Sequence, residues 1–330
     1  MSTHSSTSSS NPAAGGGGRS RRWVLALLGL IALFLLSVEG MTRFAFPRIS
    51  KLQRRMAWEY KEALATGRET GGGNSVLIVG NSLLNAAVET DELKRALAPE
   101  WKLTRFQVED TTILDWHYGL RRLFAEGARP KVVLVMLSAP QAAANNVRGE
   151  YFAYHLMQAS DVVRVSQELK LHPTNACSML FGHFSMFYGV RAEIRKWLLT
   201  AMMPGFQDVG SMMTRRAKKS EIDSDAIHRI ARDRIRAMHD LAAQHQAKLI
   251  WILPPLLSPE DGGKGLRAAA GEAGVEVLVP MQSGALPASD YSDGFHLNGS
   301  GKARFTAAII PVLRQHLDAQ LTAGSSALKP

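Results

Sequence analysis

The sequence predicts an α/β fold, in which a parallel five-stranded sheet lies between two layers of helices. Two observations carry this prediction. Five short apolar runs between residues 75 and 280 alternate with helix-like stretches, and this pattern is typical of a parallel sheet covered on both faces. A long apolar segment near the N-terminus stands apart from it and predicts one preceding transmembrane helix. The predicted arrangement is three-layered and flavodoxin-like.

The N-terminal region divides into three segments. Residues 1–22 begin with a serine- and glycine-rich stretch, which cannot bury enough surface to offset chain entropy, so we expect a disordered cytoplasmic N-terminus. Residues 23–41 follow an arginine cluster and are almost wholly apolar, which predicts a transmembrane signal anchor. Residues 42–74 predict a juxtamembrane helix and a glycine linker. A cleaved signal peptide and a buried helix are the alternatives for the apolar segment, although Glu39 interrupts a small-residue cleavage site.

The predicted location of the chain follows from the basic residues of its N-terminus. A short N-terminus with an arginine cluster favours retention in the cytoplasm. We therefore expect a single-pass protein of the cell inner (cytoplasmic) membrane, with its large C-terminal part periplasmic or extracytoplasmic. Whether the signal anchor is cleaved stays open.

The sequence predicts that residues 75–320 form the α/β domain and that a disordered tail follows over residues 321–330. Its strands read SVLIVG, KLTRFQV, KVVLVML, AKLIWIL and VEVLVP. Helices are predicted near residues 91–97, 114–126, 224–246, 265–273 and 301–317. The third and fourth strands are too far apart for a simple crossover, so residues from about 138 to 222 predict a helical insertion. Within it, residues 151–171 and 190–203 predict helices.

The composition limits the classes of function. The 330-residue chain has a formal net charge of +10 and one cysteine, Cys177. One cysteine excludes a disulfide framework and a cysteine-rich metal site. The basic residues flank the apolar segment or are spread over predicted helices, and no nucleic-acid motif occurs, so we expect no nucleic-acid partner. No motif has metal-ligand spacing, and we expect neither a metal nor a cofactor.

A serine follows the first predicted strand, in SVLIVGNSLLN. Ligands of parallel sheets bind beyond the carboxyl ends of the strands, where Ser82 is expected. Gly80 would permit a tight strand-to-helix turn that projects the hydroxyl group. Alone, this pattern also fits an ordinary turn.

A histidine that suits this serine occurs near the end of the chain, in SDYSDGFHLNGSGKARF. Asp293 precedes His296 by three residues, a spacing that lets a carboxylate hold the ring tautomer. The following residues predict a helix N-cap. Because this loop also falls at the carboxyl edge of the sheet, Ser82, His296 and Asp293 can meet there as nucleophile, base and orienting acceptor.

These two motifs carry a family resemblance over about residues 75–318. GNSLL resembles the first sequence block of the SGNH (GDSL-like) hydrolase superfamily, with Asn81 in place of its usual aspartate, and DGFHLN resembles the last block. The resemblance implies Ser82 as nucleophile, His296 as general base and Asp293 as its partner. It also implies a Ser-His-Asp triad that works through an acyl-serine.

The middle blocks of that family do not match. The family has a glycine after the second strand and Gly-x-Asn-Asp after the third, where this chain has VEDTTILDW and MLSAPQAAANN. The Ser82 N–H supplies one donor to a developing oxyanion, and the second donor is unassigned. The candidates for oxyanion or substrate binding are Asn81, Thr111, Ser138, Gln141, Asn145, Asn146 and Arg148.

The N-terminal anchor and the insertion resemble those of membrane-anchored SGNH-like proteins of polysaccharide O-acetylation and D-alanyl transfer. This resemblance implies a serine esterase or O-acyltransferase that modifies cell-surface or exported polysaccharide. It implies a glycan or acyl-ester substrate, with the cytoplasmic membrane and a membrane-bound O-acyltransferase as partners. The alternative is a catalytically inactive SGNH-like scaffold or glycan-binding subunit of a polysaccharide assembly complex. A plain ligand-binding protein is a third hypothesis, but GGKG at 262–265 lacks the context of a phosphate loop.

Other residues have two interpretations each. His117 and His183 fit either the site or ordinary helix packing, and Tyr151 fits either substrate binding or packing. An apolar stretch beside a basic run predicts either membrane contact or a packed helix corner; it comprises Met202, Met203, Phe206, Met212 and Met213.

Overall fold

The computed structural model describes residues 17–68, 74–203 and 223–326. Five parallel strands form one sheet in the order β2-β1-β3-β4-β5. The strands are β1 (Ser75–Gly80), β2 (Lys102–Gln107), β3 (Val132–Met136), β4 (Lys248–Ile252) and β5 (Glu276–Leu278). The predicted α/β fold with a parallel five-stranded sheet is confirmed.

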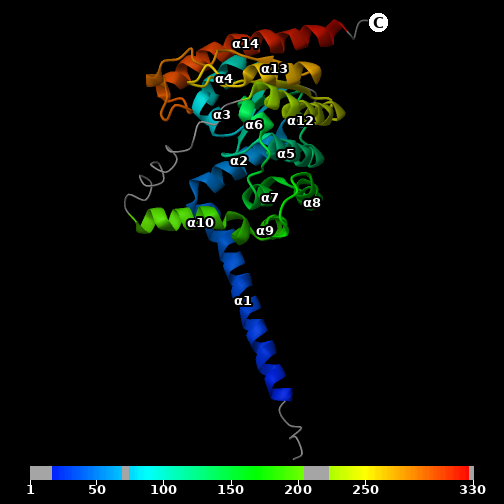
Figure 1. Ribbon diagram of the computed structural model, residues 1–330, viewed down its shortest axis with the longest axis vertical. Helices are drawn as coiled ribbons and strands as arrows, with labels where there is room; N and C mark the ends of the chain where they lie inside the picture. Colours follow the sequence, from blue (N-terminus) through cyan, green and yellow to red (C-terminus); the bar gives the residue numbers. More distant parts are fainter. Residues whose placement is uncertain (1–16, 69–73, 204–222, 327–330) are drawn as a thin grey trace, which may run out of the picture.

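Helices cover both faces of the sheet (Figure 1). One face packs against α3 (Ser82–Ala87), α4 (Thr90–Leu97) and α14 (Gly299–Ser326). The other packs against α2 (Lys51–Ala65), α5 (Ile113–Ala125), α12 (Ser224–Gln244) and α13 (Gly263–Glu272). Every residue of β1 and β3 is buried, which explains why their sequences are continuously apolar and do not alternate.

The insertion after β3 is helical. It comprises α6 (Ala139–Ala143), α7 (Glu150–Leu156), α8 (Ala159–Glu168), α9 (Pro173–Phe184) and α10 (Met186–Met202). The single helix predicted over residues 151–171 is wrong, because the chain is extended at Met157. The Arg122 guanidinium donates to the carbonyl oxygens of His155 and Met157, at 3.1 and 3.3 Å, and these bonds satisfy the carbonyl groups that end α7. Residues 204–222, with Phe206, Met212 and Met213, lie outside the described residues.

The N-terminal helix α1 (Gly17–Ile49) projects away from the sheet domain (Figure 1). It is the one helix of the described part of the chain that is long and apolar enough to cross a membrane, and none of its most apolar stretch is buried. The helix begins six residues before Trp23 and continues past residue 41 to Ile49. This helix is therefore long enough for the predicted transmembrane segment, and it continues without a break into the juxtamembrane region.

The juxtamembrane helix α2 packs against the edge strand β2. The Glu59 side chain is fully buried; its Oε2 accepts the Gln107 N–H at 2.8 Å, and its Oε1 accepts from Arg105 at 2.6 Å. An edge strand has unpaired N–H groups that need partners. Glu59 satisfies one of them, so α2 covers this edge and is part of the packed domain.

The last helix begins as the sequence predicts. Asn298 Oδ1 accepts the N–H groups of Ser300 and Gly301 at 3.0 and 3.2 Å, which caps α14. The helix ends at Ser326, not near Leu317; residues 327–330 of the predicted tail lie outside the described residues.

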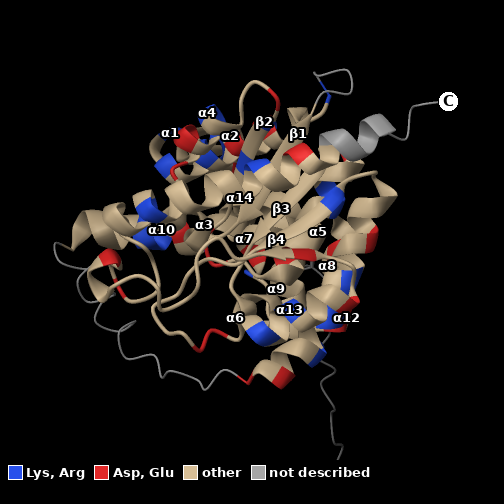
Figure 2. Ribbon diagram, turned by 90° about the horizontal axis from the view of Figure 1, so that it is seen from above, with Lys and Arg blue, Asp and Glu red and all other residues tan. Residues whose placement is uncertain are grey.

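Charged residues of both signs are interspersed along the ribbon of the outer helices in Figure 2. No single-sign face dominates this view, in agreement with the interpretation of the net charge as spread over solvated helix faces.

Candidate active site

Ser82 is the first residue of α3, directly beyond the carboxyl end of β1. The turn before it depends on Gly80 for close packing: a Cβ atom there would lie 2.6 Å from the Met136 carbonyl oxygen of the neighbouring strand. The backbone of Gly80 has no positive φ angle. The glycine is therefore required by the approach of β3, and not by the turn conformation expected from the sequence.

Asn81 caps α3 and holds the loop that follows β2. Its Oδ1 accepts the Leu83 N–H at 3.0 Å, and its Nδ2 donates to the Thr111 carbonyl oxygen at 2.9 Å. The side chain is fully buried. Both the oxygen and the nitrogen of the amide are thus engaged, so Asn81 is not an oxyanion donor. The contact to Thr111 also explains why residue 81 is an amide, since a carboxylate has no N–H group to donate.

Asp293 and His296 share one turn between β5 and α14. Asp293 Oδ1 accepts the N–H groups of Phe295 and His296, at 2.9 and 2.7 Å, and its Oδ2 lies 2.7 Å from His296 Nδ1. Gly294, inside this turn, has φ +80°, a conformation that favours glycine. The spacing of three residues therefore lets one carboxylate fix both the turn and the ring.

His296 Nε2 lies 2.9 Å from Ser82 Oγ. The structure thus brings together all three residues of the predicted triad. Because Asp293 accepts from Nδ1–H, the imidazole has its Nε2 lone pair toward the serine hydroxyl. Partial burial raises the pKa of the Asp293 carboxyl, but hydrogen bonds from the His296 N–H, the His296 ring and the Phe295 N–H outweigh it and lower the pKa overall. The carboxylate is therefore ionised at neutral pH.

The triad is open to solvent. The side chains of His296 and Asp293 are 30% and 49% exposed. The Phe295 ring, which is about one third exposed, stands edge-on to the imidazole with the ring centroids 5.2 Å apart. A site of this kind admits a large substrate without a conformational opening.

The loop after β2 uses its polar side chains internally. Thr111 is buried; its hydroxyl donates to the Val108 carbonyl oxygen at 2.7 Å and accepts the Trp116 indole N–H at 2.9 Å. Asp110 adopts a left-handed conformation, with φ 57°. The Thr111 side chain is therefore a structural group and not a free oxyanion donor.

The start of the insertion is likewise tied into the fold. Arg148 donates to the Glu109 carbonyl oxygen at 2.6 Å and to Glu193 at 3.1 Å. Asn145 Oδ1 accepts from Arg234 at 2.7 Å, and the Asn146 carbonyl oxygen accepts the Thr112 hydroxyl at 2.8 Å. These bonds join the insertion to α12 and to the loop before α5, so none of the three candidates is directed at the triad by a contact.

Ser138 and Gln141 lie at the end of β3, the strand beside β1. Gln141 Oε1 accepts the Ser138 N–H at 3.0 Å, which caps the start of α6 directly after β3. The Ser138 hydroxyl is buried, whereas Gln141 is only partly buried. Its oxygen is occupied, so its NH₂ group is the part available to a further acceptor.

The remaining candidates pack in the helices. His183 Nδ1 lies 2.9 Å from the Ala153 carbonyl oxygen, at the corner of α7 and α9. His117 lies on α5, and burial lowers its pKa to about 4. The Tyr151 hydroxyl accepts from Gln53 at 2.9 Å. All three positions agree with the packing interpretation.

One buried group was missed by the sequence analysis. Asp115 is fully buried and accepts the N–H groups of Thr112 and Arg148, at 2.8 and 2.9 Å. Burial raises the pKa of its carboxyl to about 7, against the opposing effect of these hydrogen bonds. The signal was present in the sequence, because Thr112 and Asp115 have the Thr-x-x-Asp spacing of a capping box.

Comparisons with known proteins found no matching family model and no matching curated protein. Similar solved structures include a GDSL-like lipase from Bacteroides thetaiotaomicron VPI-5482, at 11% identity and a TM-score of 0.39, covering 81% of this chain and 97% of that one. They also include an esterase, EstA, from Pseudoalteromonas sp., at 12% identity and a TM-score of 0.36, covering 74% and 99%. A catalytic mutant of an acetylxylan esterase from Geobacillus stearothermophilus has 12% identity and a TM-score of 0.36, covering 72% and 93%.

At these identities and TM-scores the similarity assigns neither an activity nor a substrate to this chain. The chemistry is therefore inferred from the sheet and from the contacts of Ser82, His296 and Asp293.

Proposed function

We propose that the chain is a membrane-anchored serine esterase or O-acyltransferase that acts on acyl esters of cell-surface or exported polysaccharide. The observation that carries this proposal is the pair of hydrogen-bond contacts from Ser82 Oγ to His296 Nε2 and from His296 Nδ1 to Asp293 Oδ2, at 2.9 and 2.7 Å. A serine, a base and an orienting acceptor in this order form an activated nucleophile.

The reaction proceeds in two balanced steps. Ser82 Oγ attacks the acyl carbonyl carbon while His296 Nε2 takes the hydroxyl proton, and the tetrahedral intermediate collapses as His296 returns that proton to the departing alcohol. The acyl-serine is then attacked by an acceptor hydroxyl, whose proton passes to His296 and back to Ser82 Oγ. Water as acceptor gives hydrolysis, and a sugar hydroxyl gives transfer.

The oxyanion of each intermediate needs donors near Ser82. The Ser82 N–H is the first of α3 and has no intrahelical acceptor. The Asn81, Thr111 and Arg148 side chains are engaged in the contacts described above, and Asn145 is bound to Arg234 on α12. Gln141 follows β3, the strand beside β1, and its Nε2 is the group available to a further acceptor, so it is the best second donor among the predicted candidates. We assign it this role within the proposal.

The surroundings of the triad support a polymeric substrate. The turn that holds Asp293 and His296 lies beside the segment after β4: a Cβ atom at Gly294 would touch Leu257 at 3.6 Å. The same segment borders an open cavity of about 710 Å³, lined in part by Asp261, Lys264 and Arg267. An exposed triad and a polar cavity along the same segment suit a hydroxyl-rich chain better than a small apolar ester.

The proposal is tested with the full chain, its Ser82→Ala variant and its Ser300→Ala variant as a matched control. Ser300 is an exposed serine on the first turn of α14. We expect turnover of a small acetyl ester, or acetylation of a glycan from an acetyl donor, by the wild type and the control. Ser82→Ala should lose about 10⁴-fold or more in kcat. Equal activity of both variants would refute the nucleophile, and activity in none would favour the inactive scaffold.

A further inference from the structure

The junction between α1 and the insertion is held by one carboxylate. Glu39, on α1, accepts the Ser185 hydroxyl at 2.7 Å and the N–H groups of Met186 and Phe187 at 2.8 and 3.0 Å. These N–H groups open α10 and have no intrahelical acceptors. Arg43, one turn further along α1, donates to the Phe184 carbonyl oxygen at 3.0 Å, at the end of α9. Glu39 and Arg43 thus fix the α9–α10 corner on α1.

Helices α9 and α10 lie crosswise to α1, at the level where α1 leaves the domain (Figure 1). On α10, Gly189 and Val190 are buried, and a Cβ atom at Gly189 would come within 2.8 Å of the Tyr154 side chain on α7. Leu198 and Met202, which helical periodicity places on the side of α10 opposite Gly189, are 43% and 75% exposed.

The same division holds on α9. Gly182 is buried against α7, since a Cβ atom there would come within 2.5 Å of Glu150. Phe181 and Phe184 are 62% and 63% exposed. Phe181, Phe184, Leu198 and Met202 are together called the apolar platform. The packed-corner interpretation does not account for the exposure of its members, nor for that of Met203 at 53%.

The position of the apolar platform along α1 matches a membrane boundary. The apolar part of α1, from Trp23 to Val38 with Ser37 within it, spans roughly 24 Å at ~1.5 Å per residue, whereas a bilayer core is about 30 Å thick. If Trp23 marks one boundary, the other falls about four residues beyond Val38, near Arg43. That is the level at which α9 and α10 meet α1.

The chemistry of this corner also suits the lipid headgroup layer. Glu39 lies at the end of the apolar run, where a free carboxylate would be costly, and its oxygens are satisfied by α10 and by Arg43 at 2.5 Å. Arg195 and Lys196, both exposed on α10, extend basic side chains beside the platform, as interfacial helices do next to phosphate groups.

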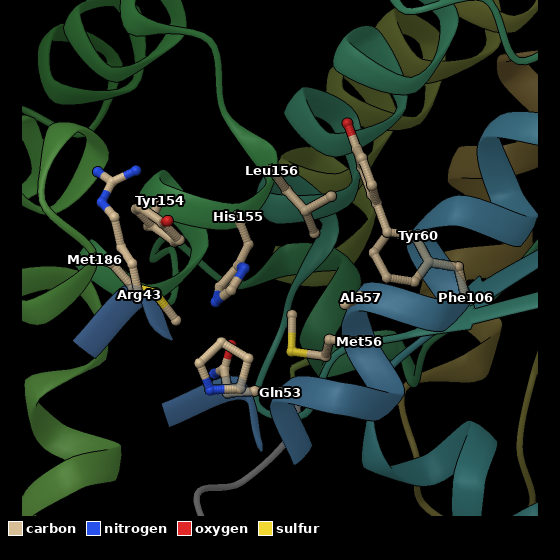
Figure 3. Close-up of a pocket in the computed structure, with 11 residues that line it drawn as sticks. Arg43, Gln53, Met56, Ala57, Tyr60, Phe106, Tyr154, His155, Leu156 and Met186 are labelled. Atoms are coloured by element: carbon tan, nitrogen blue, oxygen red, sulfur yellow. The ribbon is translucent and has the colours of Figure 1, made fainter. Parts of the chain in front are cut away.

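The seam between the helices is incompletely filled by protein. Arg43, Gln53, Met56, Tyr154, His155 and Met186 are among the residues that line a cavity of about 410 Å³ between α1, α2, α7 and α10 (Figure 3). The contacts of Glu39 and Arg43 therefore join α1 to the corner beside a cavity and not across a fully packed seam. A second support, outside the seam, would fix the orientation of the domain.

We propose that the apolar platform lies in the headgroup layer of the membrane that α1 spans, so that α1 and the α9–α10 corner hold the domain at two points. The occupant of the platform is the lipid bilayer. This inference rests on the transmembrane anchoring that is part of the proposed function. Its consequence is a fixed orientation of the triad relative to the membrane surface.

The test uses the full chain in lipid nanodiscs and exploits its single cysteine. In a Cys177→Ala background, one cysteine is introduced by Phe181→Cys, Leu198→Cys or Met202→Cys and labelled with an environment-sensitive fluorophore. Asp240→Cys on α12 is the matched aqueous control, since Asp240 is 60% exposed. Leu30→Cys reports on α1 itself. The readout is quenching by lipids that carry a nitroxide on the acyl chain.

We expect the three platform positions to be quenched roughly threefold or more above Asp240→Cys, as for side chains of an interfacial helix. Strong quenching at Leu30→Cys with aqueous behaviour at all three platform positions would overturn the platform and leave the anchor standing. Aqueous behaviour at Leu30→Cys as well would overturn both. Shielding from water at the platform without lipid quenching would also overturn the proposal, because it would place protein there instead of lipid.

Discussion

The triad and the α1–α10 junction are both built around a carboxylate and a serine, but the two regions differ in how far apart their partners lie in the sequence. Asp293 and His296 share one turn, and only Ser82, 214 residues away from His296, must be delivered by the fold. Glu39 reaches Ser185 across 146 residues, from one helix to the start of another. The comparison shows that a site at strand ends can be predicted from short motifs, whereas a helix-capping contact between distant segments cannot.

The largest effect is expected from replacing Asp293, the triad residue that shares one turn with His296. Asp293→Asn should lower kcat by about 10⁴-fold, because an amide that donates to Nδ1 favours the tautomer with the proton on Nε2, facing Ser82. Ester turnover measures the loss, and thermal unfolding checks that the fold survives. Wild-type kcat in a folded variant would show that the carboxylate only shapes the turn.

The next effect concerns the oxyanion donor. Gln141→Ala should lower kcat by about 10²- to 10³-fold with little change in KM, because the donor acts on the charge that develops in the transition state. Asn145→Ala is the matched control, since Asn145 is exposed and bound to Arg234. A loss in the control with none at Gln141 would transfer the role to Asn145.

A smaller effect concerns the position before the serine. Asn81→Asp removes the donor to the Thr111 carbonyl oxygen and buries a carboxylate, so the free energy of unfolding should fall by about 1–3 kcal/mol. Asn85→Asp, an exposed position on the same helix, should change it little. Equal denaturant midpoints for both variants would contradict the structural role given to Asn81.

The smallest expected effect is a change of slope with pH. The pKa of Asp115 is about 7 in the folded chain and about 3.9 when unfolded. Between these values the folded state holds the proton and the unfolded state does not, so this group makes stability fall as pH rises from about 4 to about 7 and then level off. Denaturant unfolding across this range should have a flatter slope in Asp115→Asn; an unchanged slope would show that Asp115 is already ionised.

The sequence predicted the parts of the molecule that depend on local patterns. Continuous apolar runs located the strands of the sheet, and the ends of parallel strands placed Ser82 and His296 at one edge. The reason for Gly80 was not predictable, because the atom that excludes a side chain belongs to Met136 on another strand. The engagement of Asn145 and Arg148 was hidden for the same reason, since their partners, Arg234 and Glu193, lie on other helices. The break after α7 depends on Arg122, more than thirty residues away.

The most direct test of the central claim is covalent capture of the nucleophile. The full chain is treated with a fluorophosphonate ester and analysed by peptide mass spectrometry, alongside Ser82→Ala and Ser300→Ala. The account predicts a single adduct on Ser82 in the wild type and in Ser300→Ala, and none in Ser82→Ala. A folded wild-type chain that takes up no label, or takes it up equally after Ser82→Ala, would contradict the assignment of Ser82 as an activated serine.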